Sequence, residues 1–493
     1  MRTIVLLAII GLVACSCRGE ESLKITVSPE TVSTGYIGVG VEWDPYDEAE
    51  SWGAPLSDAD WQKLFDRLDV MRPGYVRCMI NSPYRYYNPV TKQYDKTRHI
   101  ESISRLLQYC TDRNIPVVYG EYNPPDWSMK DSPQWVDMSV DYLNYLVNDL
   151  GFNCIRYFVI FNEPDGNWAS TDGDYELWKS MLLRFNDKMA EYPSLKEKVQ
   201  FAAPDVVAEY KNPHSKYDTQ GWLRQTAQEA DSLVGIYDIH AYPGQAEVRK
   251  GDYAGILLRY RQIIPENKKI ILGEAGFKYW READSLLMKE YNRRVEGHPF
   301  TKGTDSNMLV YDTFYGLDMA LLGIETMNSG FSGLAAWMLD DAMHSCGDSG
   351  KPEDIKLWGM WNILGEEVFH DATQEEVRPW YYAWSLLSRY FPAGSNILKT
   401  TFDRTQDVYV AVAEKNGEYS MAAVNVGNSD KQLNITFPDT FPDNWGDATL
   451  YVYNEKHPVP DKSGVIVKKT HRMTIPAQSF VVLTNMFQKS TIF

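Results

Sequence analysis

Two glutamates lie at the ends of short hydrophobic runs and could act chemically as a pair. Glu163 follows the run in "YFVIFNEPDG" (157–166), and Glu274 ends the run in "KIILGEAG" (269–276). Two carboxyl groups about 5–5.5 Å apart can cleave a glycosidic bond with retention, because one protonates the leaving oxygen while the other attacks the anomeric carbon. Either glutamate alone could equally cap a helix or lie in a solvated loop, so the fold has to decide between these readings.

The chain around these glutamates alternates strand-like runs with amphipathic stretches. The eight runs span 36–43, 75–80, 115–122, 154–164, 199–206, 235–243, 269–276 and 333–341. Stretches such as 57–70, which opens on Ser57 in a near match to a capping box, predict helices between them. Eight strand–helix repeats favour the α/β class and a (β/α)8 TIM barrel. A doubly wound open sheet is the rival, but neither GxGxxG nor GxxxxGK[ST] occurs for a nucleotide.

A barrel of this kind would bring the two glutamates together. Side chains at the carboxyl ends of its strands converge on one pocket. Glu163 ends the fourth run and Glu274 the seventh, and these strands lie nearly across the barrel from each other. The two carboxylates are therefore expected to face each other, in a partly desolvated place that can separate their pKa values.

The pattern changes after residue 391. Short alternating strands separated by Asn, Asp, Gly and Pro fill 396–486 and predict a C-terminal β-sandwich. The early segment 23–32 could add a strand to it. The expected organisation is a signal peptide over 1–15, a tether and possible sandwich strand over 16–34, the barrel over 35–392 and the sandwich over 393–493.

The segments "IRYFVIFNEPDGNW" (155–168) and "ILGEAG" (271–276) resemble clan A of the retaining glycoside hydrolases. The resemblance implies that Glu163 is the acid/base, that Glu274 is the nucleophile, and that Asn162 hydrogen-bonds the sugar 2-hydroxyl. Landmarks such as "AAPDV" (202–206) and "LWGMWN" (357–362) look most like family 39. The residues after both glutamates depart from that family's pattern, which leaves the family open.

Four further residues match the clan's pattern. His240 and Tyr242 in "DIHAY" would line the pocket, and Tyr242 would donate to Glu274. Arg77 resembles the strand-two arginine that holds the nucleophile, and Trp337 resembles the aromatic floor of the sugar site. A buried structural histidine, an ion pair at the barrel bottom and a core tryptophan are the respective alternatives.

Other side chains at the same predicted end could meet the substrate or be structural. Glu42 and Trp43 end the first run, and Glu121, Tyr122 and Asn123 end the third. Aromatic planes for sugar stacking are offered by predicted loop residues Trp127, Trp168, Trp280, Trp358 and Trp361. The segment 340–346 offers possible metal ligands in Asp340, Asp341, His344 and Cys346. Because the retaining mechanism needs no metal, neither a functional metal nor a cofactor is expected, and a structural calcium is left open.

Composition narrows the partners. Lys and Arg total 49 and Asp and Glu 67, a net charge of −18 with a pI near 5.0 and no basic cluster, so nucleic acid is not expected. GxSxG and HExxH are absent from the sequence, which leaves serine and zinc hydrolases without support.

The N-terminus predicts export. Arg2 precedes the apolar run "TIVLLAIIGLVA", and "LVAC" resembles a lipobox in which Cys15 is lipidated, with Cys17 the weaker candidate and an ordinary signal peptide the alternative. A bacterial lipoprotein of the outer membrane is expected. Four other cysteines, Cys78, Cys110, Cys154 and Cys346, form no CxxC pair and are expected to be buried free thiols, with one disulfide left open.

The sequence thus predicts a retaining hydrolase of β-type glycosidic bonds in polysaccharide or oligosaccharide. A non-catalytic glycan-binding lipoprotein and a transglycosylase are the alternatives. The sugar, the choice between exo and endo action, and the oligomeric state are left open, since fold analogy carries no information on them.

Overall fold

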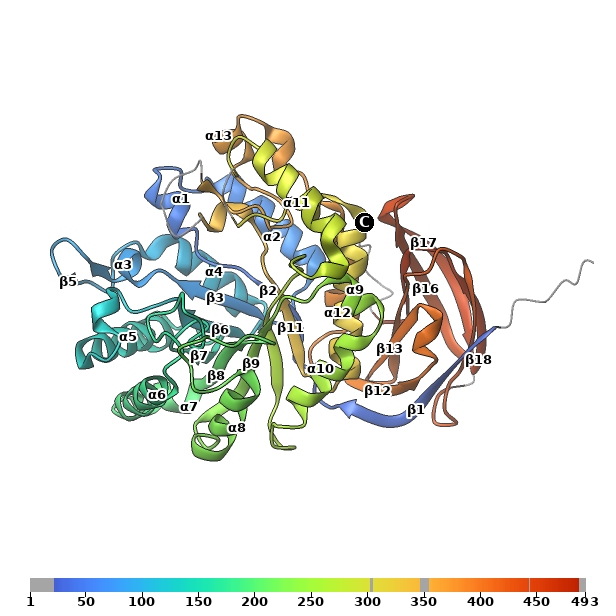
Figure 1. Cartoon of the computed structure of the whole chain (residues 1–493), viewed down its shortest axis with the longest axis horizontal. Helices are drawn as coiled ribbons and strands as arrows, with labels where there is room; N and C mark the ends of the chain where they lie inside the picture. Colours follow the sequence, from blue (N-terminus) through green and yellow to red (C-terminus); the bar gives the residue numbers. More distant parts are fainter. Residues whose placement is uncertain (1–21, 302–304, 346–353, 443, 487–493) are drawn as a thin grey trace, which may run out of the picture.

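The computed structural model describes residues 22–301, 305–345, 354–442 and 444–486, which form a barrel domain and a sheet domain (Figure 1). Cys15, Cys17, the expected signal peptide and Cys346 lie outside these residues. No helix of the described residues is both long and apolar enough to cross a membrane.

The described residues contain a closed barrel of eight parallel strands that follow one another in chain order. Most of these strands are buried on both faces, since helices cover the outside and side chains fill the inside, which explains why they read as continuous hydrophobic runs. The predicted (β/α)8 barrel and all eight runs are confirmed. The strands are β2 (Gly38–Glu42), β3 (Val76–Ile80), β6 (Val117–Glu121), β7 (Ile155–Val159), β8 (Gln200–Val207), β9 (Val234–Ala241), β10 (Ile270–Ala275) and β11 (Gly333–Ala336).

Helices surround the barrel and connect its strands (Figure 1). Helix α2 begins as expected, because the Ser57 hydroxyl accepts from the Asp60 N–H while the Asp60 carboxylate accepts from the Ser57 N–H. The longer helices are α2 (Asp58–Met71), α4 (Ile100–Asp112), α5 (Pro133–Asn144), α6 (Tyr175–Ala190), α8 (Thr219–Glu229), α10 (Asp252–Arg261), α11 (Ser285–Gly297), α12 (Thr313–Asn328) and α14 (Pro379–Tyr390). Shorter pieces are α1 (Asp47–Ser51), α3 (Ser82–Arg85), α7 (Pro193–Lys198), α9 (Gln245–Arg249), α13 (Gly365–Phe369) and the hairpin of β4 (Tyr87–Asn88) and β5 (Gln93–Tyr94).

The second domain is a sheet that folds over on itself. Its order is β17-β16-β19-β14-β13-β12-β1-β15-β18 in the described residues. Apolar side chains from strands far apart in this order, such as Leu433 on β15 and Val481 on β19, share one core, as in a β-sandwich. The early segment supplies β1, which pairs with β12 and β15. The strands are β1 (Leu23–Ser33), β12 (Asn396–Thr401), β13 (Val408–Lys415), β14 (Glu418–Asn425), β15 (Lys431–Thr436), β16 (Asn444–Asn454), β17 (His457–Lys468), β18 (Thr470–Ile475) and β19 (Ser479–Thr484).

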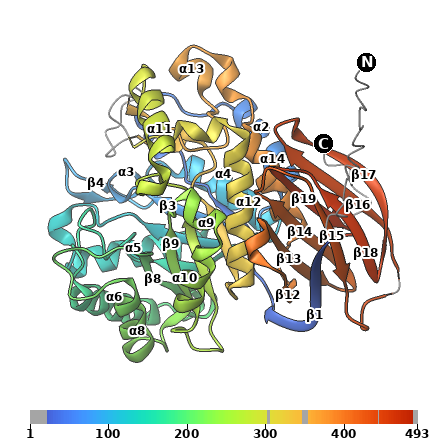
Figure 2. The same ribbon diagram turned by 45° about the vertical axis from the view of Figure 1, so that its right-hand side comes forward.

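Helices α12 and α14 lie between the barrel and the sheet domain (Figure 2). Across this interface the Asn328 side chain donates to the Val410 carbonyl at 2.9 Å, and Arg404 pairs with the buried carboxylate of Glu325 at 2.5 Å. These contacts fix the two domains against each other. In the barrel, Cys78, Cys110 and Cys154 are buried free thiols.

Candidate active site

Glu163 and Glu274 meet at the carboxyl end of the barrel. Glu274 lies in β10, whereas β7 ends at Val159, so Glu163 stands in the bend beyond the strand and not at its end as predicted. One carboxylate oxygen of each glutamate and a ring nitrogen of His240 lie within 4.8 Å of one another. This separation is that of a closely spaced carboxyl pair, and it is shorter than the gap of roughly 6.5–9.5 Å that accommodates a water between the carboxyl groups.

Two donors hold the Glu274 carboxylate from opposite sides. Arg77 on β3 donates from Nη1 to Oε1 at 2.8 Å, and the Tyr242 hydroxyl donates to Oε2 at 2.5 Å. Both bonds keep the carboxylate fixed. The contacts that the sequence suggested for Arg77 and Tyr242 are therefore present.

Arg77 connects the other side chains at this end of the barrel. Its buried guanidinium donates to Glu42 at 2.7 Å, to the Asn162 side-chain oxygen at 2.6 Å and to Asp205 at 3.2 Å. Because a guanidinium only donates, the Asn162 oxygen must face Arg77, and its NH2 group is left to donate elsewhere. That orientation suits the expected bond from Asn162 to a sugar hydroxyl.

Glu163 is held by three neighbours. Its backbone has φ 47°, which a residue with a side chain rarely adopts, and its N–H donates to Asp205 at 3.3 Å. The His240 Nδ1 lies 2.8 Å from Oε1, and the Trp168 indole N–H donates to Oε2 at 2.6 Å. Gly166 makes room for that indole, since a Cβ there would lie 2.4 Å from it.

The charge state of Glu163 follows from these contacts. Burial would raise the pKa of Glu163, but the hydrogen bond and positive charge of His240 outweigh it and lower that pKa. Burial would likewise lower the pKa of His240, but the Glu274 and Asp205 carboxylates raise it well above its ordinary value. Both pKa shifts favour an ion pair between the two side chains.

Asp205 is a site residue that the sequence analysis did not single out. It lies in β8, at a register irregularity, and its carboxylate contacts Arg77, His240 and the Glu163 N–H. Burial would raise the pKa of Asp205, but the charges of His240 and Arg77 lower it to about 2. Asp205 is part of the motif "AAPDV" (202–206). Its place near the end of the fifth predicted strand could have identified it as a site residue.

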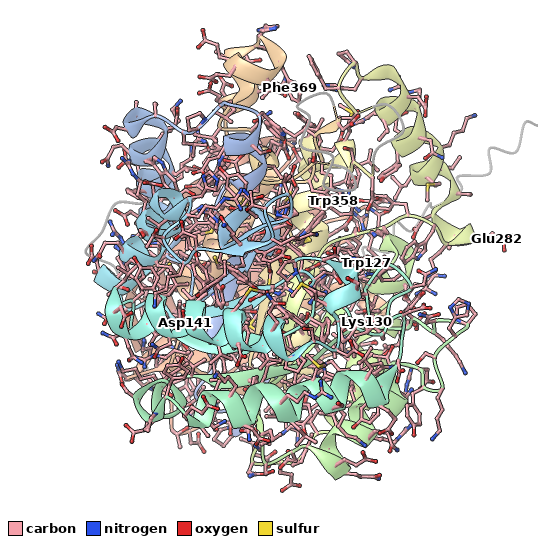
Figure 3. All side chains as sticks on the ribbon, turned by 90° about the vertical axis from the view of Figure 1, so that its left-hand side faces the viewer. Trp127, Lys130, Asp141, Glu282, Trp358 and Phe369 are labelled. Atoms are coloured by element: carbon pink, nitrogen blue, oxygen red, sulfur yellow. The ribbon has the colours of Figure 1, made fainter. Side chains whose placement is uncertain are left out.

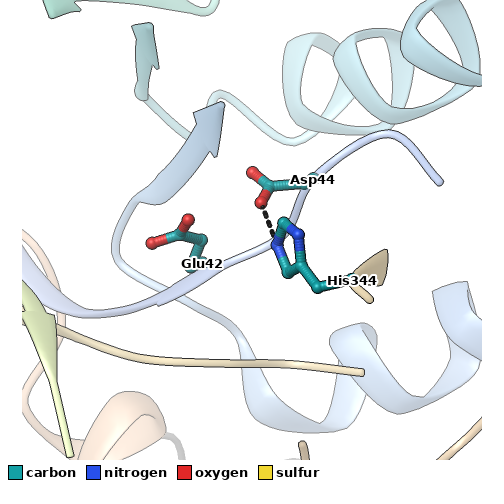
Figure 4. Close-up of side chains that lie close together, drawn as sticks. All are labelled: Glu42, Asp44 and His344. Atoms are coloured by element: carbon teal, nitrogen blue, oxygen red, sulfur yellow. Dashed lines mark hydrogen bonds and ion pairs between the residues drawn. The ribbon is translucent and has the colours of Figure 1, made fainter. Parts of the chain in front are cut away.

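A second polar cluster adjoins Glu42, which accepts from Arg77. Figure 4 shows Glu42 with Asp44 and His344. The Asp44 carboxylate lies 2.7 Å from the His344 Nε2 and accepts from the Tyr122 hydroxyl at 2.7 Å, and Tyr122 also reaches Glu42 at 3.0 Å. Glu42 is fully buried between Arg77 and Tyr122, so it positions these groups and does not contact sugar as one reading of the sequence proposed.

Trp337 follows β11 at the same end of the barrel. Its ring lies 6.1 Å from the His344 ring in a stacked arrangement, 5.1 Å from Trp358 and 6.4 Å from Tyr242. Through Tyr242 it adjoins Glu274. This is a suitable position for a wall of a sugar site.

Trp43 was predicted to contact substrate, and this prediction is wrong. Its side chain is fully buried against Trp61, Phe65 and Tyr109 in the helix layer. Successive side chains of a strand point to opposite faces, so Glu42 at the end of β2 points into the barrel and Trp43 points outward.

The predicted stacking residues separate into two groups. Trp127, Trp168 and Trp280 are 54%, 44% and 59% exposed, whereas Trp358 and Trp361 are buried in the core. Figure 3 labels one member of each group, the exposed Trp127 and the buried Trp358. Of these, Trp168 touches the candidate carboxyl pair.

Glu121 is structural. It is fully buried and accepts from Ser82, Tyr86 and Trp135. A sugar at the end of the barrel cannot reach a carboxylate enclosed in this way.

Several acidic and histidine side chains are close enough to hold an ion. Within the described residues these are Glu42–Asp44–His344, Glu163–His240–Glu274 and Asp205–Asp238–His240. Arg77 already donates to Glu42, Glu274 and Asp205, and its fixed positive charge would repel a cation there. Hydrogen bonds and ion pairs account for the other members of these groups, whereas both oxygens of the buried Asp238 carboxylate lack a hydrogen-bond partner.

The acids of 340–341 are also committed to internal contacts. Asp340 accepts from Tyr46 and Trp361, and Asp341 pairs with Arg378. These bonds anchor the loop after β11 and leave the two carboxylates without a ligand role.

Comparisons with known proteins show the fold. No protein-family model matches the sequence, and no curated protein sequence is significantly similar to it. By structure, the chain resembles the catalytic domain of a family 30 xylanase C from Talaromyces cellulolyticus (TM-score 0.61, 14% identity), a glucosidase from Croceicoccus marinus (0.62, 12%) and a monomeric β-xylosidase from Caulobacter crescentus CB15 (0.56, 11%). Each alignment covers 94% of this chain and 99% of the other.

The similar structures include enzymes of glycoside hydrolase families 30 and 51. The likeness does not single out family 39, which the motifs resembled. At these identities the likeness extends to the combination of a barrel and a sheet domain in one chain.

Proposed function

We propose that the chain is a retaining glycoside hydrolase of β-type bonds, with Glu163 as acid/base and Glu274 as nucleophile. The observation that carries the proposal is the separation of at most 4.8 Å between oxygens of these carboxylates, one in the bend after the fourth barrel strand and one near the end of the seventh. The structural likeness to a xylanase, a glucosidase and a β-xylosidase supports it.

In the first step Glu274 attacks the anomeric carbon while Glu163 gives a proton to the leaving oxygen. Arg77 and Tyr242 fix the attacking carboxylate, so little reorganisation is needed before attack. The Asn162 NH2 group donates to the sugar 2-hydroxyl, a bond that strengthens in the transition state.

In the second step Glu163 takes a proton from water, and the water oxygen displaces Glu274 from the anomeric carbon. Glu163 suits this exchange because its side chain is 13% exposed, whereas that of Glu274 is 6% exposed. Water therefore approaches from the Glu163 side.

The test is a panel of 4-nitrophenyl glycosides and polysaccharides that begins with β-xylosides, β-glucosides and xylan. Glu274→Gln should lower kcat/KM by at least about a thousandfold on every substrate, since it removes the nucleophile. Glu163→Gln should do so on the polysaccharides, whose poor leaving groups need the proton, and should lower it less on 4-nitrophenyl glycosides. Glu229→Gln, which changes a surface glutamate paired with Lys179, is the matched control.

Proton NMR of the first product identifies the stereochemistry. Retention supports the pair, and an inverted first product would remove Glu274 as nucleophile. Binding of a polysaccharide without cleavage would indicate a glycan-binding protein, and sugar transfer without release of free sugar would indicate a transglycosylase.

We also propose that Cys15 is lipidated and anchors the protein to the bacterial outer membrane. The sequence "LVAC" and the tether that follows support this. Cys15→Ser should move the expressed protein from the detergent phase to the aqueous phase in a Triton X-114 partition, and an unchanged partition would contradict the anchor.

A further inference from the structure

We propose that His240 stores the proton which Glu163 delivers, so that the acid of the reaction is a Glu163–His240 pair oriented by Asp205. This inference rests on the proposed function, because Glu163 is the proton donor there. It adds a residue that holds the proton and a residue that fixes the ring.

The His240 ring is held between two carboxylates. Nδ1 lies 2.8 Å from Glu163 Oε1, and Nε2 lies 3.1 Å from Asp205 Oδ1. The ring is fully buried, so water cannot replace either partner. Each ring nitrogen therefore needs a proton between itself and an oxygen.

The number of protons follows from this geometry. If Glu163 and Asp205 were both ionised and the imidazole neutral, one ring nitrogen would present its lone pair to a carboxylate oxygen. Protonating the imidazole, or protonating Glu163 so that it donates to Nδ1, removes that repulsion. Both descriptions place one mobile proton between Nδ1 and Oε1.

The surrounding charges place that proton on His240 in the unliganded protein. Glu274 Oε2 lies 3.4 Å from Nδ1, and negative charge exceeds positive charge around the ring. This agrees with the raised pKa of His240 and the lowered pKa of Glu163. The charged or titratable groups around the pair are Glu42, Arg77, Asp205, Asp238, Tyr242, Glu274 and, near Glu163, Lys278.

Substrate reverses the preference. A sugar over Glu163 excludes water, and a charged pair loses more by desolvation than a neutral pair. The proton then moves from Nδ1 to Oε1 and on to the glycosidic oxygen, which takes the electrons of the breaking C–O bond while Glu274 bonds to the anomeric carbon.

The second step restores the pair. Water gives a proton to Glu163, its oxygen bonds to the anomeric carbon, and the ester to Glu274 breaks and returns the electrons to that carboxylate. The recovered proton is shared again with His240, so the cycle balances without another reactant.

Asp205 has the positioning role. It holds the second ring proton on Nε2, so Nδ1 alone faces Glu163 and exchanges the mobile proton. The second oxygen of Asp205 accepts from Arg77 and from the Glu163 N–H. These two bonds hold the Asp205 carboxylate in place, and the carboxylate in turn holds the His240 ring.

The first test needs no substrate. In the full chain labelled with 15N-histidine, eight histidines give signals, and His240 is assigned by its loss in His240→Asn. We expect its imidazole to stay charged at pH 7.5, about one unit above the ordinary pKa of histidine, and Glu163→Gln to move its titration to lower pH by about one unit or more. His214→Asn, a change at an exposed histidine paired with Asp172, should leave it unchanged.

A His240 that titrates near pH 6.5, or that does not respond to Glu163→Gln, overturns the inference. Should His240→Asn fail to fold, Asp205→Asn keeps the ring and must move the same signal to lower pH. If the signals behave as expected but no glycoside is cleaved, the proposed function fails while the charged pair stands.

The second test uses phenyl and 2,4-dinitrophenyl β-glycosides of the sugar that wild type cleaves. Asp205→Asn should move the alkaline limb of kcat/KM to lower pH by about one unit. His240→Asn should slow the phenyl substrate at least about tenfold more than the dinitrophenyl one, because only the poor leaving group needs the proton. Equal losses on both substrates would assign His240 a merely structural role.

Discussion

The hydroxyl of Tyr242 offers the sharpest test of how the nucleophile is held. Tyr242→Phe removes the 2.5 Å bond to Glu274 Oε2 and keeps the ring. The ring still packs against Trp337 at 6.4 Å and Trp358 at 6.0 Å, so little else should change. Arg77 remains as the donor to the other carboxylate oxygen.

The magnitude follows from one charge-assisted hydrogen bond. Such a bond contributes about 1.5–3 kcal/mol, and about 1.4 kcal/mol corresponds to a factor of ten in rate. If the bond orients Glu274 for attack, kcat/KM falls about 10- to 150-fold. Apparent affinity should change less than kcat, since the lost bond is to the enzyme's own carboxylate.

The assay is hydrolysis of the aryl glycoside that wild type cleaves best, with thermal melting measured alongside. Tyr94→Phe is the matched control, because its hydroxyl donates to Asp141 on α5 at 2.7 Å, away from the site (Figure 3). A Tyr242→Phe enzyme within about twofold of wild type would refute the proposed orientation of Glu274. So would an equal loss of activity in Tyr94→Phe.

Three further changes follow from the same contacts. Gly166→Ala would place a methyl group 2.4 Å from the Trp168 indole, and the displaced indole loses its bond to Glu163, so kcat/KM should fall about tenfold with little change in melting temperature. Arg77→Met leaves buried carboxylates unpaired and should lower the free energy of unfolding by about 3–5 kcal/mol in urea titrations. Burial raises the pKa of Glu325 from 4.5 to about 7, so the folded state binds this proton more tightly than the unfolded chain. The stability of wild type relative to Glu325→Gln should therefore fall by up to about 3 kcal/mol between pH 4.5 and 7.5 in calorimetry at each pH, and a flat difference would contradict the raised pKa.

The barrel could be predicted because its strands carry a repeated physical signal. A strand enclosed by helices outside and side chains inside has two apolar faces, and "YVRCMI" or "KIILGEAG" shows this directly. The positions of Glu163 and Glu274 followed from counting such runs. Counting runs does not show in which direction a side chain points. A strand buried on both faces has no alternation of polar and apolar residues, and Trp43 was therefore wrongly expected to point into the barrel.

Asp205 marks a second limit of the sequence. It stands in a strand that the sequence predicted, yet its carboxylate reaches Glu163 and His240 only because the strand is irregular there and the residue has φ 65°. Glu163 itself has φ 47° in a bend that the predicted strand would have continued through. The Asp205 carboxylate accepts from the Glu163 N–H, so one hydrogen bond joins these two irregular segments and positions the candidate acid. The alternation of side chains along a strand predicts their direction only where the strand is regular. Asp205 and Glu163 lie where the backbone departs from a regular strand, so their side-chain directions could not be predicted in this way.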